Sequence, residues 1–353
     1  MHEDRTRVAG AGALDYVRGV DGGLAVSLLP VAEADAAGLR GLDRKPVFER
    51  FERNRERYLA AIDLFLESGS ADEAARLATV IAPLWIATGR LDEGAEWLER
   101  VLEADASGAV RKQLCIDAAF LHFWRGDDGR AAMLFEEAAN IARQTDDAAT
   151  EALALTGSAR IALRTDVEAA RRLCLAALEL ADPVAAPLAR GSAVHVLGVA
   201  AQMAGDLEEA ASYMNERLAL ARASGNYAAV ASEAGNLAIV ERQLGNLDAA
   251  ETLSLEALDI SVRREDDWLI PYLLSGLAAI AVERGELCRS ATLIGAAEAM
   301  VEEQNAEWPP DERVHYDATR ARLEASMSGA DLAAAREEGR QFDRARATRF
   351  ALG

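Results

Sequence analysis

The chain has 353 residues, a formal net charge of −21 and a sequence pI near 4.7. A surface this acidic repels phosphate backbones, which argues against nucleic-acid binding by the chain alone. Aromatic residues make up only 5% of the sequence and there are only 8 prolines, while alanine, leucine, arginine and glutamate are abundant, a mixture that favours an all-α fold.

The sequence indicates a cytoplasmic protein. No apolar run approaches the roughly 18 residues needed to span a bilayer, and the N-terminal stretch MHEDRTRVAGAG lacks the pattern of a signal peptide. Only Lys45 and Lys112 are lysines among 38 basic residues, and no basic run that would bind anionic lipid is present. Cys115, Cys174 and Cys288 lie far apart without CxxC spacing, so we expect small, buried thiols in a reducing compartment.

Residues 1–45 form the expected N-terminal lead-in. Within them, residues 1–30 are rich in glycine and alanine, have no sustained helical period before about Leu24, and are expected to be short helical or partly ordered. The first well-defined helix is expected after Pro46, because proline suits the first turn of a helix.

Residues 46–300 contain the main signal, an internal repeat. Its clearest copies read LGVAAQMAGDLEEAASYM at 197–214, LAIVERQLGNLDAAETLS at 237–254 and LAAIAVERGELCRSATLI at 277–294, which places them 40 residues apart. Weaker copies turn at Gly89, Gly126 and Thr165. The pattern predicts six helix–turn–helix units in one continuous solenoid between about residues 70 and 300.

Each copy has a glycine at the turn and small residues on both sides of it. Gly205, Gly245 and Gly285 are expected to adopt the left-handed conformation that ends a helix. Asp206, Asn246 or Glu286, and the acidic residues that follow, favour the next helix start. The small residues allow close approach of two antiparallel helices; they are Gly198, Ala238, Ala278, Ala210, Ala250 and Ser290.

Residues 301–353 are expected to form C-terminal capping helices. Pro309 and Pro310 precede a polar helix predicted from about Asp311. A polar cap of this kind would cover the exposed apolar face of the last repeat.

The repeat resembles the tetratricopeptide repeat, with its leucine and small residue before the turn, glycine at the turn and alanines at fixed offsets after it. Leu237, Ala238, Gly245, Ala250 and Ala257 show this pattern. The period differs, because the usual repeat has about 34 residues. The resemblance implies a right-handed superhelical solenoid with a concave groove lined by the first helix of each unit.

The two ends resemble a narrower group. The segment beginning LRGLDRKPVFERF, and the terminal stretches LIGAAEAM, WPPDERVHY and EEGRQF, are similar to the C-terminal sensor arm of bacterial signal-transducing ATPases that act as transcriptional activators. No GxxxxGK[ST] phosphate loop and no DNA-binding helix-turn-helix accompany this segment, so ATP binding is not expected. Met1 favours a free-standing relative over an excised arm.

The groove positions that this resemblance implies are aromatic, apolar or polar residues suited to a helical peptide or an apolar ligand. They fall on Phe120, Phe123, Trp124, Leu155, His195, Gln202, Met203, Ile239, Arg242, Gln243, Tyr272 and Glu283. Ordinary core packing remains the alternative for Phe123 and Trp124, and a structural role the alternative for His195.

Two functions remain open from the sequence. One is a non-enzymatic module that binds a protein or peptide partner through the groove, in regulation; the other is a small-molecule receptor or sequestering protein that uses the same groove. No catalytic motif, cofactor motif or metal-ligand spacing among the four histidines is present, so neither an enzyme nor a cofactor is expected.

Overall fold

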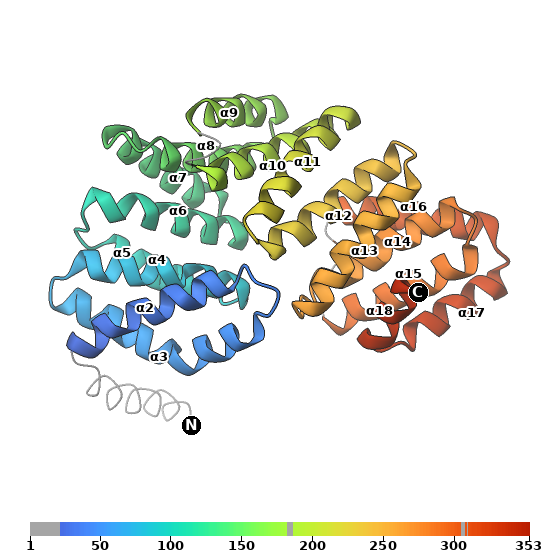
Figure 1. Ribbon diagram of the computed structural model, residues 1–353, viewed down its shortest axis with the longest axis horizontal. Helices are drawn as coiled ribbons and strands as arrows, with labels where there is room; N and C mark the ends of the chain where they lie inside the picture. The colour runs from blue at the N-terminus through green and yellow to red at the C-terminus, as the bar shows by residue number, and fades with distance from the viewer. Residues whose placement is uncertain (1–21, 182–185, 305–307, 309) are drawn as a thin grey trace, which may run out of the picture. The chain divides into compact units, whose positions relative to one another are not determined.

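The computed structural model describes residues 22–181, 186–304, 308 and 310–353. These residues form seventeen α-helices and no strand (Figure 1), which confirms the all-α prediction. Contacts within the chain divide it into two compact units. The first comprises the residues up to Leu39 together with Arg44–Ala200, and the second comprises Arg40–Asp43 and Ala201–Gly353.

The helices of the first unit are short and joined by tight turns. They are α2 (Gly22–Gly38), α3 (Lys45–Glu67), α4 (Ala71–Ala87), α5 (Leu91–Leu102), α6 (Gly108–Arg125), α7 (Asp128–Gln144), α8 (Ala148–Ala162) and α9 (Val167–Leu180). The helix α10 (Pro187–Ala204) contains the boundary between the units, after Ala200.

The helices of the second unit continue the same pattern and end in the cap. They are α11 (Leu207–Ala223), α12 (Tyr227–Gln243), α13 (Leu247–Arg263), α14 (Ile270–Glu283), α15 (Leu287–Glu303), α16 (Pro310–Ser326), α17 (Gly329–Arg340) and α18 (Arg344–Leu352). The helix α16 begins at the predicted proline, whereas Pro309 lies outside the described residues.

Five of the six predicted helix–turn–helix units each lie within one compact unit, as the packed pairs α4–α5, α6–α7, α8–α9, α12–α13 and α14–α15. The helices α10 and α11 follow the same order in the chain. In the first unit, α4 packs on α6 and α6 on α8, so the first helices of successive pairs form one layer. The second helices α5, α7 and α9 pack against the helices of this layer. In the second unit, α12, α14 and α16 contact one another in the same way.

The turns have the predicted backbone conformation. Gly89, Gly126, Gly205, Gly245 and Gly285 have φ between 70° and 85°, which is the left-handed region open to glycine. The acidic residue after the turn caps the next helix in several pairs; the Asp206 carboxylate, for example, accepts a hydrogen bond from the Glu209 backbone N–H at 3.0 Å.

Two turns depart from this capping pattern. The Asn246 side chain does not cap α13; its amide donates to Glu241 Oε2 at 2.8 Å instead. The Glu286 side chain likewise makes no capping hydrogen bond at the start of α15.

The small residues beside the turns are buried as predicted. Ala210, Ala250 and Ser290 are 0% exposed, and the Ser290 hydroxyl donates to the Ala278 carbonyl at 2.7 Å. The hydroxyl is therefore satisfied by the backbone of the paired helix, and this serine replaces alanine without leaving a buried polar group unpaired.

Arginine–carboxylate pairs join neighbouring helix pairs within each unit. The Arg130 guanidinium, for example, binds both Glu99 oxygens at 2.7 Å, which links α7 to α5. The partners lie 31 to 38 residues apart in the chain, about one repeat, in the pairs Arg90–Glu52, Arg130–Glu99, Arg164–Asp128, Arg222–Glu256, Arg284–Glu251 and Arg340–Glu302.

The helix α2 lies in the segment for which the sequence predicts a short helical or partly ordered lead-in, and its sequence period is weak because apolar residues are spread around the helix. One expectation needs correction. Cys115 and Cys174 are buried, but Cys288 is exposed near the start of α15, so it is not a core thiol. The predictions for residues 1–21 lie outside the described residues.

The cap contains an unusually close helix crossing between α15 and α17. Gly295 of α15 lies against the backbone of Arg336, and Gly339 of α17 lies against the backbone of Thr292. Neither crossing point has room for a Cβ atom, so these two glycines fix the distance between the helices.

Candidate functional site

The first unit presents an aromatic cluster at the C-terminal end of α6. Phe120 and Phe123 are partly buried against the core, and the Phe123 and Trp124 rings meet edge to face with centroids 5.4 Å apart. The Arg164 guanidinium lies over the Phe123 ring at 4.6 Å. Trp124, in contrast, is 55% exposed. Core packing therefore explains the position of the two phenylalanines but not that of Trp124.

Two polar residues share a face of α6 with this cluster. Gln113, Asp117, Phe120 and Trp124 follow one another at intervals of four, three and four residues, which places them along one side of the helix. The Gln113 amide donates to Asp117 Oδ2 at 3.2 Å. Burial raises the pKa of Asp117 to about 7, so its carboxyl group changes charge near neutral pH.

The helix α10 carries three of the predicted groove residues. His195 and Gln202 are half-buried, whereas Met203 is 57% exposed. An exposed methionine offers a flexible apolar contact.

The predicted groove residues of the second unit are mostly engaged with other side chains. Arg242 donates to Glu283 Oε1 at 2.6 Å and lies 3.4 Å from His315 Nδ1. Tyr272 is only 5% exposed, while Ile239 is half-buried on α12. Arg242 therefore already has a carboxylate partner, and Tyr272 offers little surface.

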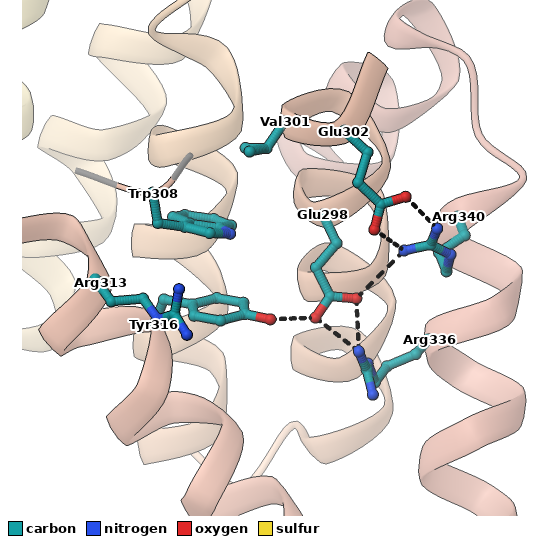
Figure 2. A pocket seen from close by; sticks show the side chains of 8 residues that line it. All are labelled: Glu298, Val301, Glu302, Trp308, Arg313, Tyr316, Arg336 and Arg340. Carbon is teal, nitrogen blue, oxygen red and sulfur yellow. Dashed lines mark hydrogen bonds and ion pairs between the residues drawn. The ribbon is translucent and has the colours of Figure 1, made fainter. Parts of the chain in front are cut away.

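The second unit also contains a pocket of about 450 Å³ in the cap, between α15, α16 and α17. Its lining residues are Glu298, Val301, Glu302, Trp308, Arg313, Tyr316, Arg336 and Arg340. Figure 2 shows the Tyr316 hydroxyl pointing at Glu298, with Trp308 lying over Tyr316 and the arginines of α17 reaching toward α15 from the other side.

Glu298 is the electrostatic centre of this pocket. It is 6% exposed, accepts two hydrogen bonds of 2.7 Å from Arg336 Nη2, and accepts one of 2.5 Å from the Tyr316 hydroxyl. Burial, followed by the hydrogen bond to Glu298, raises the pKa of Tyr316, so the phenol remains a donor. The buried carboxylate is thereby fully paired.

No cluster of three or more histidine, cysteine or acidic side chains in the described ranges has the geometry to hold a metal ion. Among the helices that the structure describes, none combines the length and apolarity required to cross a bilayer.

Comparison with known proteins rests on structure. No family model and no curated protein matches the sequence. The APC/C hetero-tetramer Cut9–Hcn1 aligns with a TM-score of 0.55 and 14% identity over 86% of this chain. The fold is a tetratricopeptide-like helical repeat. The alignment spans 58% of the length of that chain, and its low identity shows the fold alone.

A second solved structure also aligns with the chain. It is that of BtubC (BKLC) from P. vanneervenii, with a TM-score of 0.48 and 19% identity, covering 59% of this chain and 91% of that one.

Sequence reasoning missed the cap pocket and Asp117. The segment WPPDERVHY contains Trp308, Arg313 and Tyr316, but its prolines and polar residues predict only a capping helix. Its partners Glu298 and Arg336 lie on α15 of the last repeat and on α17 of the cap, and the repeat pattern of the sequence does not extend into the cap. Asp117 carried a weak signal, because it is an acidic residue inside an otherwise apolar helical stretch.

Proposed function

We propose that this chain is a non-enzymatic interaction module that binds a protein or peptide partner through the first helices of its repeats. The observation that supports this most directly is Trp124, which is 55% exposed beside Phe123 on α6. A large exposed aromatic ring on a rigid helix is typical of an interaction hot spot, because its burial releases water at little entropic cost.

The polar residues of α6 suggest how a partner would be oriented. Gln113 and Asp117 lie along the same face as Trp124, so an extended or helical segment crossing the aromatic cluster would meet an amide and a carboxyl group. A partner that places an apolar side chain on Trp124 and a hydrogen-bonding or basic group near Asp117 would contact both the aromatic cluster and the polar residues. The net charge of −21 favours a basic partner through long-range attraction.

The cellular role that we propose is regulation in the bacterial cytoplasm. The support is the likeness of the terminal segments to the sensor arm of ATPase activators, together with the three free cysteines. A second candidate, a small-molecule receptor, is supported by the 450 Å³ pocket in the cap, which consists of different residues from the α6 surface.

A comparison of two exposed tryptophans tests the α6 surface. Trp124→Ala and Trp268→Ala remove similar exposed rings, since the two residues are 55% and 60% exposed. Proteins that copurify from native cell extract with the wild-type chain should be lost with Trp124→Ala and retained with Trp268→Ala. A partner retained equally by both variants would rule out α6 as the binding surface.

A further inference from the structure

The lining of the cap pocket has a small excess of positive charge, although the chain as a whole is acidic. Three arginines and two glutamates line it, although acidic residues outnumber basic ones by 59 to 38 in the whole sequence. Two aromatic rings, Trp308 and Tyr316, complete its wall. Its volume of about 450 Å³ lies within the range of small-molecule sites.

The innermost charges are fixed and hold the shape of the pocket. Glu298 binds Arg336 and Tyr316 at 2.5 to 2.7 Å and is 6% exposed. Arg336 Nε is buried and has no hydrogen-bond partner. Breaking a buried pair of this kind is costly, so Glu298 and Arg336 form a rigid floor of the pocket.

The outer ion pairs are weakly held by comparison. Arg340 binds Glu302, whose side chain is 63% exposed, and Arg313 binds Asp317 with both side chains more than half exposed. Exposed pairs of this type contribute about 0–1 kcal/mol. Arg340 also lies 3.7 Å from the buried Glu298, whereas among the described residues Arg313 pairs only with Asp317, so an incoming carboxylate can take the place of Asp317 on Arg313 with little loss.

The aromatic wall selects a flat ligand. Trp308 and Tyr316 are stacked, with centroids 4.3 Å apart and planes within 17° of each other. Trp308 also meets the Tyr272 ring edge to face, with centroids 5.7 Å apart, but it is only half-buried and lines the pocket, so part of its ring remains accessible. A planar group on Trp308 would place an attached carboxylate beside Arg313, which lies on the same side of the pocket in Figure 2.

We infer that the cap pocket binds a planar aromatic carboxylate, with Trp308 contacting the ring and Arg313 binding the carboxylate; Figure 2 shows Arg313 on the same side of the pocket as Trp308. Such a group occurs in free aryl carboxylates and at the C-terminus of a peptide that ends in an aromatic residue. This site is independent of the α6 surface, so either proposal can fail without the other.

Calorimetric titration of the full chain tests the chemistry. The probes are 2-naphthoate, its neutral amide, and a short peptide ending in tryptophan with either a free or an amidated C-terminus. The two acids should bind and the two amides should bind at least about tenfold more weakly, the loss expected for one charge-assisted hydrogen bond. If the peptide with a free C-terminus binds more tightly than naphthoate, the natural ligand is the C-terminus of a peptide. If naphthoate binds more tightly, the natural ligand is a free aryl carboxylate.

Matched variants locate the site. Arg313→Gln should weaken binding of both acids about tenfold, whereas Arg263→Gln should leave it unchanged, because Arg263 forms a similar exposed pair with Asp259 on α13. Trp308→Phe keeps a smaller ring and should reduce affinity less than Trp308→Ala. All of these variants except Trp308→Ala alter exposed or conservative positions and should fold.

Three results would overturn the inference. They are the absence of calorimetric binding by either acid, equal binding of acid and amide, and equal affinity of Arg313→Gln and Arg263→Gln.

Discussion

The glycine crossing of α15 and α17 gives the sharpest test of the structure. A Cβ atom added at Gly295 would lie 2.0 Å from the Arg336 carbonyl oxygen, and one added at Gly339 would lie 1.9 Å from the Thr292 carbonyl oxygen. Ordinary contact begins at 3.4 Å, so Gly295→Ala or Gly339→Ala requires the helices to separate locally by about 1.4 or 1.5 Å, the differences 3.4 − 2.0 and 3.4 − 1.9. The obstructing atoms are backbone and cannot rotate away.

The expected cost lies at the upper end of what overpacking causes, about 3 kcal/mol for each variant. For a cooperative unit of roughly 150–250 residues this corresponds to a fall in Tm of roughly 6–12 °C. Thermal unfolding followed by circular dichroism measures it directly.

Gly276→Ala is the matched control, since Gly276 is also within a helix and has no atom within 4 Å of an added Cβ. It should raise the free energy of unfolding by up to about 1 kcal/mol, because alanine favours helix more than glycine does. If Gly295→Ala and Gly276→Ala melt alike, the close crossing of α15 and α17 is wrong.

Three further predictions concern tryptophan, alanine and aspartate side chains. Trp124→Ala should leave the melting temperature nearly unchanged, because the ring is 55% exposed. Trp85→Ala removes a side chain that is 0% exposed and should cost about 3–5 kcal/mol. Equal losses of stability in thermal melts would mean that Trp124 packs in the core. Ala210→Leu and Ala250→Leu should each cost about 1–3 kcal/mol, because both sites are fully buried between paired helices; unchanged melts would mean that the repeat register is wrong. Burial raises the pKa of Asp117 from 3.8 to about 7, so the folded state binds this proton more tightly, and the resulting stability is complete below about pH 4 and lost as the pH rises through 7. Asp117→Asn should therefore be more stable than the wild type at pH 8, by about 1–2 kcal/mol because the side chain is only partly buried, and this advantage should vanish near pH 4. Urea unfolding at pH 8 and pH 4 measures the difference in stability. An equal difference at both pH values would exclude this titration.

The fold could be predicted from the sequence because its determinants are local. The turns need a residue in the left-handed backbone conformation, which glycine adopts easily, and they occur at Gly205, Gly245 and Gly285. The small residues around these turns recur at a fixed period. The pattern fails where the helix is not amphipathic, as in α2, whose apolar residues lie on all sides.

The sites could be predicted only in part, because they depend on contacts between distant segments. The position of Trp124 in the repeat predicts a groove residue, but whether its side chain is exposed depends on the packing of the neighbouring helices. Whether Arg242 is available depends on Glu283, which lies 41 residues away in the next helix pair. The pocket at Glu298 needs three helices whose mutual packing carries no sequence period.

The arginine pairs between neighbouring repeats have a consequence for alkaline conditions and for lysine chemistry. Arg284–Glu251 and Arg340–Glu302 join repeats in the second unit, and neither Arg40–Asp43 nor Ala201–Gly353 contains a lysine. An ammonium group would lose its charge near pH 10, but a guanidinium remains charged. These junctions should therefore keep their ion pairs in alkaline solution, and neither acetylation nor amine-reactive reagents can neutralise them.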